Sequence, residues 1–251
     1  MKKILLVSGC SNTEKDFYSD VHPDLDTSWP KWPELLAKKL DMYCVNLAKS
    51  GMGNEYIYTT LLRYITKTNR EIIGLVIPAW TQCQRKDFQI KNYWNNQRID
   101  PDGDVFSWMR RSLDTYLNFQ ILCERYNLPY MQVQMLSPYI DWLNGLLPAE
   151  SDTSYPKGFR HTYPGDEERD NKKLIEMIAK YDNLINQKKF LGWPLSHEYG
   201  GYSLQKKLIG IRSKEAGVFR TFNLDTMISN LDHHPNAKGH EKIAEFIYER
   251  L

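Results

Sequence analysis

The stretch Ile4-Leu5-Leu6-Val7-Ser8-Gly9-Cys10-Ser11-Asn12-Thr13 decides the fold prediction. Its apolar run, Ile4–Val7, is too short for a core helix and indicates a buried parallel strand. Open α/β sheets bind their ligands at the carboxyl ends of the strands. We therefore expect Ser11 at this edge, near a helix N-terminus whose N–H groups favour developing negative charge. The alternative is that Ser11 or Asn12 only caps the next helix.

Further along the chain, apolar runs of strand length alternate with amphipathic stretches of helix length. Strands are expected at 42–47, 71–77, 130–136 and 218–223, and helices at 34–40, 55–67, 105–127, 171–185 and after the stretch 232–240 to Leu251. Such alternation predicts βαβ units and a mostly parallel sheet with helices on both faces. We expect a three-layer α/β/α sandwich with a flavodoxin-like sheet of about five strands.

The chain has no internal repeat and no linker that would divide it. We expect a single domain over residues 1–251, with loop insertions around 84–104 and 148–168. Loops of this length inside a domain are usually functional or disordered. The segment 148–168 is rich in Pro, Gly, Ser, Asp and Tyr, and is read as a loop or lid.

The charge balance and hydropathy exclude several classes of partner. The chain has 33 basic and 31 acidic residues and a net charge of +2, so it carries no electrostatic signature of nucleic-acid or anionic-membrane binding. No apolar run approaches the roughly 18–20 residues of a membrane span. Met1-Lys2-Lys3 and Cys10 resemble a lipoprotein signal, but the apolar region between them is too short for one.

The four cysteines are Cys10, Cys44, Cys83 and Cys123. Their wide spacing offers no CxxC pair for zinc or redox chemistry. Each lies in or beside an apolar run, which is typical of reduced, buried thiols in a cytoplasmic protein.

Three segments together provide the groups that acyl transfer needs. This chemistry requires a hydroxyl nucleophile, a base, a carboxylate that orients the base, and N–H donors for the oxyanion. Ser11 can be the nucleophile, His234 the base and Asp232 the orienting acid. The N–H groups of Ser11 and Gly51 can be the oxyanion donors. Taken alone, His234 could be a helix-start histidine without chemistry.

At this point the sequence resembles the SGNH/GDSL hydrolases. The nucleophile block of that family, G-D-S, reads Gly9-Cys10-Ser11 here, and the block N-x-x-x-S-G reads Asn46-Leu47-Ala48-Lys49-Ser50-Gly51. The last block reads His234-Pro235-Asn236-Ala237-Lys238-Gly239-His240, where the family commonly has H-P-N-x-x-G-H before a final helix. The blocks span nearly the whole chain in the family's order. The resemblance implies a serine esterase or acylhydrolase that needs no metal or organic cofactor.

Two departures from the family pattern concern the site. The third block, G-x-N-D, supplies an Asn donor to the oxyanion hole, and Trp80 stands in its place here. Thr81, Gln82 or Asn54 is a candidate substitute, and we expect Trp80 and Thr81 to form walls of the pocket.

The second departure is the position of the acid. Asp232 lies two residues before His234, whereas the family pattern D-x-x-H would place it at Leu231. Asp225 is the fallback acid, and a Ser–His dyad is the alternative. His233, His234 and His240 have a poor spacing for chelating a metal, and we expect His240 to pack near the start of the last helix.

The motifs and the resemblance predict an ester hydrolase. The aromatic loops and the low overall hydrophobicity favour an O-acylated glycan or another small polar ester as its substrate. One alternative is a catalytically weak or inactive binding or structural module on the same fold. Another is a nucleotide-binding flavodoxin-like protein.

Overall fold

The computed structural model describes residues 2–136, 138, 167–193, 225–229 and 231–251. Its central sheet contains β1 (Ile4–Ser8), β2 (Tyr43–Asn46), β3 (Ile73–Trp80), β6 (Gln132–Gln134) and β7 (Phe190–Leu191). The strand order is β2-β1-β3-β6-β7, and every pair is parallel. This is the flavodoxin-like order, and it confirms the predicted fold class.

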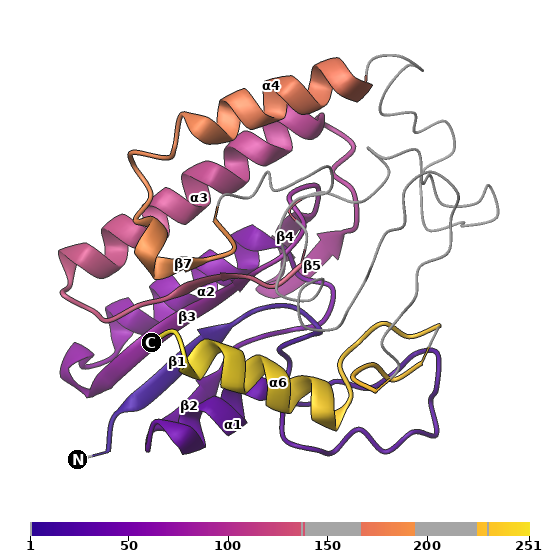
Figure 1. Cartoon of the computed structure of the whole chain (residues 1–251), viewed down its shortest axis with the longest axis vertical. Helices are drawn as coiled ribbons and strands as arrows, with labels where there is room; N and C mark the ends of the chain where they lie inside the picture. The colour runs from indigo at the N-terminus through magenta and orange to yellow at the C-terminus, as the bar shows by residue number, and fades with distance from the viewer. Residues whose placement is uncertain (1, 137, 139–166, 194–224, 230) are drawn as a thin grey trace.

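Helices cover both faces of the sheet (Figure 1). One layer contains α2 (Asn54–Lys67) and α3 (Val105–Arg125), with α4 (Glu167–Ala179) beside α3. The other layer contains α1 (Trp32–Lys39) and α6 (Ala237–Tyr248), which pack against each other. Short 3₁₀ turns precede two of the strands, at Arg70–Ile72 and Gln187–Lys189.

Successive side chains of a strand point to opposite faces of the sheet. Because helices cover both faces, the apolar strands are buried on both sides. In β1, Leu6 belongs to the core beneath α2 and α3, whereas Leu5 and Val7 belong to the core beneath α1 and α6. In β3, Val76 and Ile77 divide between the two cores in the same way. Two-sided burial explains why these strands are unbroken apolar runs.

The segment 84–104, predicted as a loop, contains a β-hairpin. Strands β4 (Lys86–Ile90) and β5 (Tyr93–Gln97) are antiparallel, and Ile90 pairs with Tyr93. The two residues between them, Lys91 and Asn92, have φ values of 48° and 69°. Positive φ at both positions is typical of the turn that matches the twist of a two-residue hairpin.

Several predicted boundaries also differ from the structure. Strand β3 continues to Trp80, three residues beyond the predicted end at 77. Helix α4 covers Glu167–Ala179 instead of 171–185. The fifth strand of the described sheet is β7, while the strand predicted at 218–223 and most of the loop predicted at 148–168 lie outside the described residues.

All four cysteines are free thiols, and burial raises the pKa of Cys83 to about 12. Within the described part of the chain, no helix is both long enough and apolar enough to cross a membrane.

Candidate active site

The structure brings Ser11, His234 and Asp232 into one hydrogen-bonded chain. The Oγ of Ser11 lies 2.8 Å from Nε2 of His234. On the other side of the ring, Nδ1 of His234 lies 2.5 Å from Oδ1 of Asp232. The same carboxylate oxygen accepts the backbone N–H of His234 at 3.0 Å. This is the order of contacts that lets an imidazole take a proton from a serine hydroxyl.

Ser11 lies on a single tight turn that follows β1. The carbonyl of Cys10 accepts the N–H groups of Thr13 and Glu14 at 2.8 and 3.1 Å. The turn needs the glycine before it, because a Cβ on Gly9 would lie 2.6 Å from Oγ1 of Thr13. The expected helix N-terminus near Ser11 is absent, and the capping alternative is wrong, because the next helix is α1 and its N-cap is Lys31.

Hydrogen bonds hold the segment that carries Gly51 against the turn that carries Ser11. The N–H of Lys49 donates to the carbonyl of Gly9 at 3.1 Å, and the N–H of Ser50 donates to Oε2 of Glu14 at 3.0 Å. Gly51 itself has φ of +79°, which only glycine adopts without strain. Among the described residues, no group accepts the N–H of Ser11 or of Gly51, so both remain available for an oxyanion.

The loop before α6 fixes the position of His234. Pro235 forms a β-bridge with Met227, and the carbonyl of His234 accepts the N–H of Ile228 at 3.0 Å. Helix α6 then begins at once, because the side chain of Asn236 accepts the N–H of Gly239 at 3.0 Å. The P-N-x-x-G part of the motif therefore sets the direction in which the chain continues from His234 into α6.

A buried serine holds the second oxygen of Asp232. The hydroxyl of Ser19 donates to Oδ2 of Asp232, and Ser19 in turn accepts the N–H of His22 at 3.0 Å. The ring of His22 also contacts Oγ of Ser229 at 2.7 Å, which ties the 11–31 segment to the acid loop a second time.

These contacts decide the charge of Asp232. Burial alone raises the pKa of Asp232, but the hydrogen bonds from His234 and Ser19 outweigh burial and hold this pKa well below its ordinary value. The carboxylate therefore stays ionised at any pH near neutral, and can stabilise an imidazolium on His234. Asp232 fills the orienting position despite its altered spacing, while Asp225 is paired with Lys238 at 3.6 Å.

Two further residues complete the surroundings of His234. The ring of Phe17 packs on the imidazole with a centroid separation of 4.4 Å. His240 is buried and its Nδ1 accepts the N–H of Trp32 in the first turn of α1 at 3.2 Å. Burial lowers the pKa of His240 to about 3, so this ring is a neutral acceptor and has a structural role.

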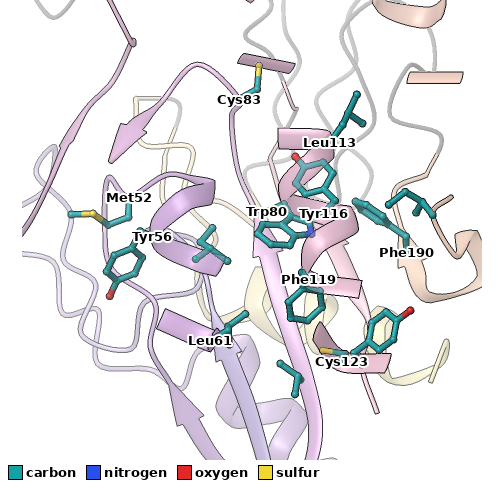
Figure 2. Packing of buried hydrophobic residues seen from close by; sticks show 14 of the residues in the cluster. Met52, Tyr56, Leu61, Trp80, Cys83, Leu113, Tyr116, Phe119, Cys123 and Phe190 are labelled. Carbon is teal, nitrogen blue, oxygen red and sulfur yellow. The ribbon is translucent and has the colours of Figure 1, made fainter. Parts of the chain in front are cut away.

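The prediction that Trp80 forms a wall of the pocket is wrong. Trp80 is fully buried in the core beneath α2 and α3, and Figure 2 shows its side chain beside those of Tyr116 and Phe119. Its ring packs on Tyr116 at a centroid separation of 4.8 Å, and its Nε1 donates to Oε1 of Gln132 at 2.9 Å. The indole is therefore a core side chain and cannot contact a bound substrate.

Asn54 and Thr81 are likewise internal. Thr81 is fully buried, and its backbone N–H donates to Oδ1 of Asn54 at 2.9 Å. The amide nitrogen of Asn54 contacts Oγ of Ser112 at 3.1 Å, which ties the end of β3 to α2 and α3. These contacts contradict the prediction that Asn54 and Thr81 bind substrate, because their backbone and amide groups hold the elements together.

Comparison with known proteins found likeness only among solved structures. The structure is similar to SGNH hydrolases and esterases. One such protein belongs to the G-D-S-L family and comes from Desulfitobacterium hafniense, with 12% identity, a TM-score of 0.49 and coverage of 100% of both chains. Another is the psychrotrophic esterase EstA from Pseudoalteromonas sp., with 10% identity, a TM-score of 0.48 and coverage of 99% of this chain and 96% of that one.

A third similar structure is an SGNH hydrolase from Slackia heliotrinireducens, with 10% identity, a TM-score of 0.46 and coverage of 100% and 99% of the two chains. A scan against protein-family models and a search of curated proteins gave no match. At these identities the likeness concerns the fold alone. The argument for function therefore rests on the geometry of Ser11, His234 and Asp232.

Sequence reasoning missed Ser19 and Phe17. Ser19 is eight positions after Ser11 but 213 residues from the carboxylate that it contacts, so no local spacing indicates the pair. The one signal in the sequence was the length of the polar segment after Ser11, which is long enough to fold back over the strand ends.

Proposed function

We propose that this protein is a serine-dependent hydrolase of small polar esters, with Ser11 as nucleophile, His234 as base and Asp232 as the orienting acid. The observation that carries the proposal is the unbroken chain from Ser11 Oγ through both ring nitrogens of His234 to Asp232, with separations of 2.8 and 2.5 Å. The proposal places the protein among SGNH-type esterases on its site as well as its fold.

In the first step, Ser11 Oγ attacks the ester carbonyl carbon while Nε2 of His234 takes the hydroxyl proton. The carbonyl oxygen becomes an oxyanion, which the N–H groups of Ser11 and Gly51 bind. Asp232 stabilises the imidazolium through Nδ1. The intermediate then collapses: the ester C–O bond breaks, and the proton on Nε2 passes to the departing alcohol oxygen.

In the second step, a water molecule attacks the acyl-enzyme, and His234 takes its proton. Collapse of the second tetrahedral intermediate breaks the bond to Ser11 Oγ and returns the proton to that oxygen. The products are the carboxylic acid and the regenerated serine, so atoms and charge balance without a cofactor.

The oxyanion site of this proposal consists of two backbone donors. Of the three candidate substitutes for the family's Asn, Asn54 is committed to Thr81 and Ser112, and Oε1 of Gln82 accepts hydrogen bonds from Arg85. Removing one oxyanion donor typically costs about 10²–10³ in rate. We therefore expect a slow esterase, with turnover well below that of an enzyme with three donors.

The test is hydrolysis of p-nitrophenyl acetate. The wild-type protein should release p-nitrophenol, and Ser11→Ala should reduce the rate to that of buffer. The matched control is Ser107→Ala, an exposed serine in the first turn of α3, which should retain the wild-type rate. Undiminished hydrolysis by Ser11→Ala would remove Ser11 from the mechanism.

The second candidate is a binding module that uses the same fold without turnover. It is favoured by the burial of Trp80, Asn54 and Thr81, and by the hydrogen bond through which the Asn54 amide holds the backbone of Thr81. A protein that leaves p-nitrophenyl acetate intact at all pH values from 6 to 9 would support this candidate.

We also propose that the reaction takes place in a reducing compartment. The proposed partner is a small-molecule or glycan ester. The four free thiols support a cytoplasmic location, since disulfides are rare in that compartment.

A further inference from the structure

The β-hairpin of β4 and β5 is attached to the segment that leads from Gly51 into α2. Strand β4 lies beside α2 (Figure 1). The carboxylate of Asp87 in β4 accepts the backbone N–H of Gly53 at 2.7 Å and that of Tyr56 at 2.8 Å. In β5, the ring of Trp94 packs edge-on against the ring of Tyr56, with a centroid separation of 5.3 Å. The hairpin is therefore fixed to the loop that carries one of the two backbone oxyanion donors.

Asn96 in β5 lies directly opposite Asp87. Residues that pair across an antiparallel ladder project to the same face, so the side chain of Asn96 faces the same loop as Asp87. A Cβ on Gly51 would lie 2.9 Å from Nδ2 of Asn96 and 3.5 Å from its Oδ1. The nitrogen of the amide is thus the nearer atom, and a glycine at position 51 allows it to approach so closely.

The amide of Asn96 has unused hydrogen-bond donors. Asn96 is half-buried, and among the described residues no group is hydrogen-bonded to its side chain. The side chain of its neighbour Asn95 instead donates to the carbonyl of Tyr93 at 3.0 Å. An amide nitrogen carries two N–H donors, and partial burial without an acceptor is unfavourable. A substrate oxygen beside Gly51 would supply the missing acceptor.

The separation of the two nitrogens suits one shared oxygen. By covalent geometry, a Cβ lies about 2.5 Å from the backbone nitrogen of its own residue. With 2.9 Å from that Cβ position to Nδ2 of Asn96, the amide lies within about 5.4 Å of the Gly51 nitrogen. Two N–H donors that each lie about 2.9 Å from one oxygen can be up to about 5.8 Å apart. An oxygen bound to the N–H of Gly51 can therefore also accept a hydrogen bond from Asn96.

We propose that Nδ2 of Asn96 is the third donor of the oxyanion site, beside the N–H groups of Ser11 and Gly51. The assignment rests on the proposed esterase function and adds one catalytic residue to its site. In both tetrahedral intermediates, the former carbonyl oxygen accepts an N–H of this amide. The amide transfers no proton and forms no covalent bond, so the balance of the two steps is unchanged.

The hairpin thus supplies a donor that the end of β3 does not. Asn54 holds Thr81 and Ser112, and Trp80 lies in the core. The chain that follows β3 returns to the loop of Gly51 with a different amide. The slow turnover expected of two backbone donors then describes a protein without the Asn96 amide, and the wild type should be faster by the contribution of one donor, about 10²–10³.

The kinetic test compares two variants of Asn96 with wild type in the hydrolysis of p-nitrophenyl acetate. Asn96→Ala should lower kcat about 10²–10³-fold, with KM within about threefold of wild type, because the lost hydrogen bond stabilises the oxyanion. Asn96→Asp keeps the shape of the side chain but replaces the donor with a charged acceptor, so its kcat should fall at least as far. Both variants should unfold at urea concentrations close to that of wild type.

The matched control is Asn95→Ala. Asn95 is also half-buried and is the preceding residue of β5, but its side chain projects to the opposite face of the hairpin. This variant should keep the wild-type kcat. Equal losses of kcat in Asn95→Ala and Asn96→Ala would show that the hairpin acts only as a support, and would overturn the assignment.

A second readout requires no turnover. When Ser11 attacks a fluorophosphonate, negative charge develops on the phosphoryl oxygen, which occupies the oxyanion site. The rate of labelling, followed by intact mass, should fall at least about tenfold in Asn96→Ala and should stay at the wild-type value in Asn95→Ala.

Failure of this assignment differs from failure of the esterase function. If Ser11→Ala abolishes hydrolysis while Asn96→Ala keeps the wild-type kcat and labelling rate, Asn96 is not an oxyanion donor and the esterase function stands. If the wild-type protein shows no hydrolysis that depends on Ser11, the esterase function is refuted and the role of Asn96 with it.

Discussion

Replacing Ser19 with alanine tests how the acid of the triad is held. Ser19 is buried, and its hydroxyl is the donor to Oδ2 of Asp232, whereas the contacts of His234 are to Oδ1. Among the described residues, no other group donates to Oδ2. Ser19→Ala therefore leaves a carboxylate oxygen without a partner in a residue that is 4% exposed.

The expected magnitude follows from these contacts. A hydrogen bond to a charged group contributes about 1.5–3 kcal/mol, and the orphaned oxygen adds to the loss because Asp232 is buried. We expect the free energy of unfolding to fall by about 2 kcal/mol at pH 7. Because the carboxylate can also rotate away from Nδ1 of His234, we expect kcat to fall about tenfold, with KM within about twofold of wild type.

The pH dependence has a defined sign. The depressed pKa of Asp232 adds stability above the ordinary carboxyl pKa, and this contribution is lost as pH falls through the folded-state pKa. Ser19→Ala raises the folded-state pKa of Asp232. The stability difference between wild type and variant should therefore be full at pH 7 and should narrow in acid, once the pH reaches the pKa of Asp232 in the variant.

The assay is urea unfolding at pH 7 and pH 3, together with steady-state hydrolysis of p-nitrophenyl acetate. Ser112→Ala is the matched control, because it removes an equally buried serine hydroxyl that contacts Asn54 in the layer of α2 and α3. Both variants should lose stability, but only Ser19→Ala should lose kcat, and Ser19→Thr should restore it. Equal losses of kcat in both alanine variants, or wild-type kcat in Ser19→Ala, would refute this reasoning.

Three further predictions follow from the fold and the site. Gly51→Ala should lower the free energy of unfolding by about 1–2 kcal/mol in urea titrations, because Gly51 has a positive φ. It should also reduce kcat at least about tenfold, because it displaces an oxyanion donor. The new Cβ would lie 2.9 Å from Nδ2 of Asn96, so adding Asn96→Ala should recover only part of the lost stability. Trp80→Phe should lower the free energy of unfolding by about 2–3 kcal/mol, since it leaves a core void and orphans Oε1 of Gln132, with KM unchanged; a specific rise in KM would show that Trp80 contacts substrate after all. In the folded state His240 has a pKa of about 3, against an ordinary value of 6.5, so the folded protein binds this proton less readily than the unfolded chain. The free energy of unfolding is therefore full above pH 6.5 and declines toward pH 3 by up to about 1.4 kcal/mol per pH unit. His240→Asn should flatten the pH dependence of urea unfolding between pH 7 and 4.5, and an unchanged slope would contradict this.

Local signals explain what the sequence predicts correctly. The run Ile4–Val7 specifies a buried strand, and the serine after it must lie at the carboxyl edge of the sheet. The residues after His234 carry their own geometry: Asn236 caps α6, and a Cβ on Gly239 would lie 2.2 Å from the carbonyl of Thr226. The cap at Asn236 is a local signal, and the close approach of the chain at Thr226 explains why the motif has a glycine at position 239.

The errors at Trp80 and the hairpin have two physical causes. Because side chains alternate between the faces of a strand, extending β3 beyond residue 77 decides that Trp80 joins the inner core beneath α2 and α3. The 86–97 hairpin turns at Lys91 and Asn92 without a glycine, so its sequence lacks the usual signal for a two-residue turn.

Contacts between distant segments are the part that the sequence leaves open. Ser19 meets Asp232 and Phe17 meets His234 only because the 11–31 segment folds over the strand ends. Neither pair has a periodicity or a fixed spacing that could indicate it. The positioning of the acid depends on this segment.

Covalent labelling of Ser11 tests the central claim most directly. A fluorophosphonate reacts with a serine that a nearby base activates: the serine oxygen displaces fluoride and forms a phosphonate ester. Intact-mass and peptide analysis of the folded protein should therefore show one adduct, on Ser11. Labelling should fail in His234→Ala and in protein that is unfolded in urea before the probe is added. Folded wild-type protein that remains unlabelled, or that carries the adduct on another serine, would contradict the assignment of Ser11 as a nucleophile activated by His234.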